Sequence, residues 1–87
     1  MRRGGTTARR TPLDQLRERV KGVPGVGAIY VLDEGYGPHM WVLLRQWSRE
    51  VEYRVYDVQE EADPTYRVHL HIRPEGSFVP PSAVPVR

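Results

Sequence analysis

Apolar residues recur three and four positions apart directly after Thr11, as they do on one face of an α-helix. They are Leu13, Leu16 and Val20. Thr11 has the side chain of an N-cap, Pro12 suits the first helical position, and Gly22 is typical of a helix stop. The pattern therefore predicts a short amphipathic helix that begins after Thr11 and ends before Gly22.

A second helical seam runs through residues 48–62, although this segment is rich in valine and tyrosine. Its apolar positions are Trp47, Val51, Val55, Val58 and Ala62. Ser48 can cap the start, and Asp63-Pro64 prevents continuation. A strand-like alternation in the same segment fails at Tyr56. We therefore expect a helix over residues 48–62, with Tyr53 and Tyr56 on the side that faces away from the sheet.

Three further stretches have the composition of β-strands. Val26–Leu32 and Met40–Leu44 flank a loop-like segment, as in an antiparallel hairpin. In Tyr66–Ile72, apolar residues alternate with polar ones. The polar positions continue through residue 73 and form the Arg/His row: Arg67, His69, His71 and Arg73. The expected fold class is α+β, a single small domain with the order α-β-β-α-β, whose three-stranded, mostly antiparallel sheet carries two helices on one face.

The two ends of the chain differ in composition from the part between them. Residues 1–10 contain four arginines and no acid, which predicts a disordered basic arm. Residues 74–87 contain four of the eight prolines, which predicts an extended tail. The α+β domain should then occupy residues 11–73. Removing the arm's four arginines from the 13 basic residues leaves 9 against 11 acids, so the net charge of +2 belongs to the arm.

Composition excludes several classes of protein. The chain has no cysteine, so neither a disulfide scaffold nor a cysteine-ligated zinc site can form. Its apolar runs are far shorter than a membrane-spanning helix requires, and no secretory signal can be recognised. We therefore expect a small cytoplasmic protein that has no membrane partner.

Histidines are the residues with the most chemical potential. His69 and His71 share one strand face and, together with His39, could supply three imidazoles to zinc. The flanking Arg67 and Arg73 oppose a bound cation, so we expect a solvated polar face with no metal and no cofactor. No nucleophile motif or phosphate-binding glycine loop is recognisable, and no catalytic residue is assigned.

Element order and apolar pattern over residues 13–73 resemble those of small bacterial nucleotidyltransferase-fold proteins. The resemblance begins with the strand Ala28–Leu32 after Val23–Val26. In that family a Gly-Ser pair follows the first strand and an Asp-x-Asp motif lies at the second. Here those places hold Asp33-Glu34 and His39-Met40-Trp41. The resemblance implies a degenerate member that lacks the catalytic motifs and cannot hold the two metal ions of nucleotidyl transfer.

A second resemblance leads to a different expectation. Arg54–Tyr56 and Arg67–Arg73 resemble the last strands of small ribosome-dependent mRNA-cleaving toxins. That resemblance implies a strand over residues 51–58, with Arg67, His69 and Tyr56 as catalytic groups. We rank it below the first one.

Together these patterns favour a non-catalytic interaction or accessory module with an unidentified protein partner. The alternative is a nucleic-acid-binding or RNA-cleaving, toxin-like protein that uses the Arg/His row, and enzymatic activity is the less favoured reading. The adjacent tyrosines Tyr53 and Tyr56 predict the interface of a homodimer. The proline-rich tail could cover the same two rings instead.

Overall fold

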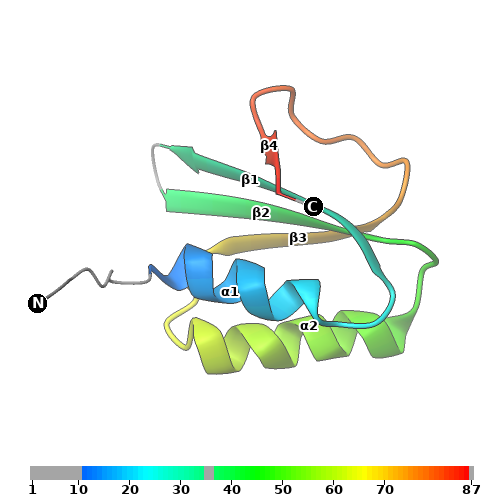
Figure 1. Cartoon of the computed structure of the whole chain (residues 1–87), viewed down its shortest axis with the longest axis horizontal. Coiled ribbons are helices and arrows are strands. Elements are labelled where there is room, and N and C mark those ends of the chain that lie inside the picture. Colours follow the sequence, from blue (N-terminus) through cyan, green and yellow to red (C-terminus); the bar gives the residue numbers. More distant parts are fainter. Residues whose placement is uncertain (1–10, 35–36, 87) are drawn as a thin grey trace, which may run out of the picture.

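The computed structural model describes residues 11–34 and 37–86, in which two helices cover one face of a four-stranded sheet (Figure 1). The elements are α1 (Pro12–Lys21), β1 (Val26–Glu34), β2 (Gly37–Leu44), α2 (Arg49–Ala62), β3 (His69–Pro74) and β4 (Val84–Pro85). The α+β class and the two helices are confirmed. The expectation of three strands is wrong, because the proline-rich end of the chain adds β4 beside β1. The predicted basic arm lies outside the described residues.

Helix α1 begins as its cap predicts and is held by its apolar face. The Thr11 hydroxyl accepts a hydrogen bond from the backbone N–H of Asp14 at 3.1 Å. Leu16 and Val20 are completely buried against the sheet and the second helix. A ten-residue helix is marginal on its own, so the burial of this face maintains it.

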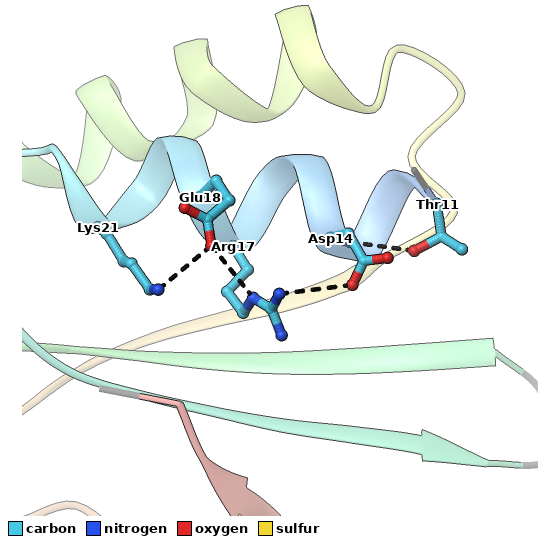
Figure 2. Close-up of polar contacts among 5 residues, drawn as sticks. All are labelled: Thr11, Asp14, Arg17, Glu18 and Lys21. Atoms are coloured by element: carbon cyan, nitrogen blue, oxygen red, sulfur yellow. Dashed lines mark hydrogen bonds and ion pairs between the residues drawn. The ribbon is translucent and has the colours of Figure 1, made fainter. Parts of the chain in front are cut away.

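Charged side chains form a ladder along one side of α1 (Figure 2). The Arg17 guanidinium lies 3.7 Å from the carboxylates of both Asp14 and Glu18. The Lys21 ammonium lies 3.2 Å from Glu18. Partly exposed pairs of this kind contribute only about 0.2–0.5 kcal/mol each, so they support the helix without determining its position.

Helix α2 is also capped as predicted. The Ser48 hydroxyl accepts from the backbone N–H of Val51 at 3.3 Å, and Val55 and Ala62 are buried. Trp47 precedes the helix and is 48% exposed, so it does not belong to the apolar seam. The strand over residues 51–58 that the toxin resemblance implied is wrong, because these residues are helical.

The sheet is mixed and has the strand order β3-β2-β1-β4. β1 pairs antiparallel with β2 and with β4. β2 and β3 are parallel, because α2 crosses over the sheet and returns the chain in the original direction. In register, Ile29 lies beside Val42 and Val42 beside Ile72, and all three are buried beneath the helices.

Strand β3 begins at a buried carboxylate. Asp63, which is 1% exposed, accepts hydrogen bonds from the backbone N–H groups of Arg67 and Val68, both at 2.9 Å. The buried amide of Gln59 donates to the same carboxylate at 3.2 Å and to the Val68 carbonyl at 2.9 Å. Tyr66 has a φ of 54° and is 56% exposed, so it lies in the turn and outside the core face expected for it.

We predict that Asp63→Ala lowers the free energy of unfolding by about 3 kcal/mol. The substitution removes a charged acceptor and leaves two buried or partly buried backbone N–H groups without a partner. Urea unfolding of the full chain measures the change. Asp57→Ala is the matched control, because Asp57 is exposed on α2 and its loss should alter stability by less than about 0.5 kcal/mol. Equal effects of the two substitutions would contradict the role assigned to Asp63.

Candidate functional site

The face of the sheet opposite the helices carries ring side chains from three strands, and we call it the ring face. These residues are Tyr30, His39, Trp41, His69 and His71. Strand alternation places each of them opposite to its buried neighbours, such as Ile29 and Met40. His69 is exposed and the other rings are partly exposed. The ring face is therefore a surface of flat side chains supported from behind by the core.

Neighbouring rings on this face lie nearly parallel. Trp41 and His71, which face each other across β2 and β3, stack with centroids 4.7 Å apart and planes 14° apart. His39 and His69 form the adjacent stack, with centroids 4.7 Å apart and planes 22° apart. His39 also lies 5.8 Å from Trp41. These centroid distances and interplanar angles are typical of favourable offset stacking between rings.

A contact between two imidazoles joins the stacks. Nδ1 of His39 lies 3.1 Å from Nε2 of His71, and the two rings are within 13° of parallel. One nitrogen donates and the other accepts, so this hydrogen bond requires that one of the two nitrogens carry no proton. Burial lowers the pKa of His71, and the nearby His39, Arg73 and His69 lower it further.

The arrangement differs from that of a metal site. Within residues 11–34 and 37–86, no group of three or more histidine or acidic side chains is positioned to hold a metal ion. A metal requires imidazole nitrogens whose in-plane lone pairs converge on one point. Here His39 and His69 present their faces to one another, and His39 and His71 bond through their nitrogens. The rings are suited to stacking and hydrogen bonding.

The Arg/His row does not form one continuous line. His71 and Arg73 lie in β3, and the charge of Arg73 is near enough to affect His71. Arg67 precedes the strand and lines a shallow pocket of about 210 Å³ at the end of the sheet. The other lining residues are Thr11, Pro12, Leu13, Asp33 and Pro38. The two arginines are exposed and flank the histidines along the chain.

Acidic side chains concentrate in the helical layer. Of the chain's 11 acidic residues, seven lie in α1 and α2, on the other side of the sheet. Arg73 lies in β3 beside the ring face and Arg67 just before this strand. The negative balance of residues 11–87 therefore says little about the local charge of the ring face.

Sequence reasoning missed the contribution of β1 and β2 to this face. The sequence suggests that His39 approaches His69 and His71, but only the pairing of β2 with β3 shows that His39 lies opposite His69 and Trp41 opposite His71. The two-residue spacing of His39 and Trp41 matches that of the two histidines on β3. That shared spacing was the available signal, but the register that joins the strands was not readable from it.

The remaining predicted site lies on the opposite layer. Tyr53 and Tyr56 are 57% and 42% exposed on α2, as the helical pattern predicts. The proline-rich tail does not cover them: Val84 and Pro85 pair with β1, and Phe78 is 78% exposed. A shallow pocket of about 560 Å³ lies at the start of α2, beside Trp47.

Comparison of the chain with protein-family models, with curated proteins and with solved structures finds no match. None of the helices in the described part of the chain has the length and apolar character needed to cross a membrane. Fold and site together define a small α+β domain whose helix-free sheet face is covered by rings.

We predict that the protein loses stability as the pH falls below about 6.5. His71 has a lowered pKa in the folded state, so the unfolded chain binds more protons in the range between the two pKa values. Stability is fully present above the unfolded pKa and is lost as the pH falls toward the folded one. His71→Gln, which cannot titrate, should flatten this dependence in urea unfolding between pH 7.5 and about 5.

The same effect can be observed directly at the histidine. NMR titration of the folded protein should give His71 a midpoint below that of an unstructured histidine peptide in the same buffer. A midpoint equal to or above the peptide value would contradict the environment described here.

Proposed function

We propose that the ring face binds single-stranded nucleic acid, and that the protein is a small module whose partner is an RNA or DNA strand. Two adjacent, nearly parallel ring stacks on a helix-free sheet support this proposal above all. The sequence favoured a non-catalytic interaction module and gave a nucleic-acid-binding protein as the alternative. The proposal joins the two, because it describes an interaction module whose partner is a nucleic acid. The resemblance to nucleotidyltransferase-fold proteins stays a separate prediction about ancestry.

Unpaired bases are the ligands that such rings can bind through their faces. Stacking of a base on an aromatic side chain is worth about 1–3 kcal/mol, and it tolerates any base because each has a π face. Trp41 gives the largest ring, and His71 stacks on one of its faces at 4.7 Å, so a base can stack only on a ring face that the neighbouring rings leave open. Sheet-based RNA-binding domains use their exposed strands in this way, although that likeness is one of architecture only.

Phosphates would be bound at the ends of β3. Arg67 and Arg73 flank His69 and His71 and are both exposed, so their guanidinium groups can contact the backbone of a strand that crosses the rings. Two phosphate contacts imply a modest salt dependence, with a slope of about −1.4 in log affinity against log salt for a single strand. Most acids lie on the helices, away from such a strand.

We predict that Trp41→Leu weakens binding of a fluorescent single-stranded oligonucleotide about tenfold or more, because it removes the largest stacking ring. Fluorescence anisotropy at low salt measures the affinity, with RNA and DNA of the same sequence as separate arms. The pair Arg67→Gln/Arg73→Gln should weaken both arms and reduce the salt slope. The pair Arg49→Gln/Arg54→Gln removes the same charge from exposed positions on α2 and should have little effect.

Several outcomes would contradict the proposed function. One is the absence of binding at low salt by the full chain. Another is equal weakening by the two arginine pairs, which would indicate non-specific attraction by the total charge. Equal affinity for duplex and single strand would also count against stacking on the rings.

We further propose that α2 forms the interface of a homodimer. Two adjacent tyrosines, Tyr53 and Tyr56, are exposed, and residues 84–85 pair with β1 and leave these rings uncovered. Exposed tyrosines are enriched at interfaces, and a small domain gains stability from the additional burial.

Light scattering should then give twice the chain mass of 10.1 kDa at micromolar concentration. Tyr53→Ser/Tyr56→Ser should restore the monomer, whereas Tyr66→Ser should not, because Tyr66 is equally exposed but lies in the turn before β3. A wild-type mass of one chain would overturn the homodimer.

A further inference from the structure

One imidazole of the ring face is oriented by a contact at one of its two ring nitrogens. His39 uses Nδ1 in its contact with Nε2 of His71, at 3.1 Å. Within the described part of the chain, Nε2 of His39, the ring nitrogen farther from the backbone, makes no hydrogen bond. If Nδ1 of His39 carries the proton and donates it to His71, Nε2 of His39 is unprotonated and can accept a proton.

His71 is suited to orient this ring. The near-parallel rings, 13° apart with centroids 5.4 Å apart, place the two nitrogens opposite one another. Stacking against Trp41 at 4.7 Å fixes the plane of His71 in turn. The lowered pKa of His71 keeps it neutral near pH 7, which leaves Nε2 able to accept from His39. His71 therefore has the features of a positioning residue that fixes the tautomer of His39.

A third imidazole lies beside the first. His69 stacks on His39 with centroids 4.7 Å apart, and its side chain is exposed. Arg67 precedes it by two residues and Arg73 follows His71 by two, so a phosphate near these rings would have cationic groups within reach. Two adjacent imidazoles, one that accepts a proton and one that gives a proton, are the pair required for general base and general acid catalysis.

We propose that the ring face cleaves single-stranded RNA by internal transesterification, an inference that rests on the proposed function. Nε2 of His39 removes the proton of a ribose 2′-hydroxyl, and the 2′-oxygen forms a bond to the adjacent phosphorus. The bond from phosphorus to the 5′-oxygen of the next nucleotide breaks, and that oxygen takes a proton from His69 as the general acid. The products are a 2′,3′-cyclic phosphate and a free 5′-hydroxyl.

This reaction requires no nucleophile from the protein, and the sequence contains no recognisable nucleophile motif. The nucleophile belongs to the RNA, so no serine or cysteine motif in the protein is required. Water is not consumed, and each proton that one imidazole accepts is matched by one that the other gives. General base and general acid steps each contribute about 10²–10⁴-fold, which predicts a slow but measurable ribonuclease. DNA, which has no 2′-hydroxyl, should bind without being cleaved.

The test uses the full chain, an excess of EDTA and an end-labelled DNA oligonucleotide that contains a single ribonucleotide. We expect cleavage only at the ribonucleotide, with the cyclic phosphate identified by mass spectrometry and a bell-shaped dependence on pH. The same oligonucleotide with deoxyribose at that position should stay intact, a comparison that leaves the protein unaltered. Arg54→Gln on α2 is the protein control and should cleave at the wild-type rate.

Substitutions separate the roles of the histidines. His39→Phe keeps a flat ring but has no nitrogen, so cleavage should fall about 100-fold or more while affinity falls much less. His71→Gln retains an acceptor for the His39 N–H and should cleave faster than His71→Leu, which fills a similar volume but has no acceptor. This rescue would not be expected if His71 only filled space.

The possible failures can be told apart. Binding without cleavage overturns this inference and leaves the proposed function intact, whereas absence of binding overturns both. Cleavage of the deoxyribose strand, or a cleavage rate unchanged in His39→Phe, would indicate a contaminating nuclease and would also overturn the inference.

Discussion

The buried carboxylate of Asp63 determines where the last long strand of the sheet begins. It accepts the backbone N–H groups of Arg67 and Val68 just beyond the end of α2, and Gln59 supports it from within the helix. Once Val68 is fixed in the core, strand alternation places His69 and His71 on the opposite face. A buried, multiply bonded carboxylate thus sets the positions of the ring side chains without touching any of them.

Parallel pairing of β2 with β3 completes the ring face. The register that puts His39 beside His69 also puts Trp41 beside His71, and it keeps Met40 and Val42 in the core. A slip of one residue would exchange the two faces, burying imidazoles and exposing aliphatic side chains. The cost of burying those polar rings without partners protects the register. Stability of the core and geometry of the ring face are therefore maintained by the same pairing.

The sequence predicted the elements whose signals are local. Both helices could be located because Thr11 and Ser48 cap them in the structure as in the pattern. β4 could not be recognised, because a two-residue strand containing Pro85 has no periodicity and exists only through β1. Asp63 was recognised as a helix stop, but its role as a buried acceptor depends on where Arg67 and Val68 return. The three histidines of the candidate site were recognised in the sequence, but their pairing and the place of Trp41 beside His71 required the register.

Net charge averages over faces that the fold separates. Seven acids lie in the helices, whereas the ring face combines aromatic and imidazole rings with the exposed Arg67 and Arg73 nearby. The lowered pKa of His71 favours its neutral form, which can stack without the desolvation cost of a buried ion. Cationic attraction then comes from the flanking guanidinium groups, which stay charged at any physiological pH. The rings therefore supply stacking, and Arg67 and Arg73 supply positive charge.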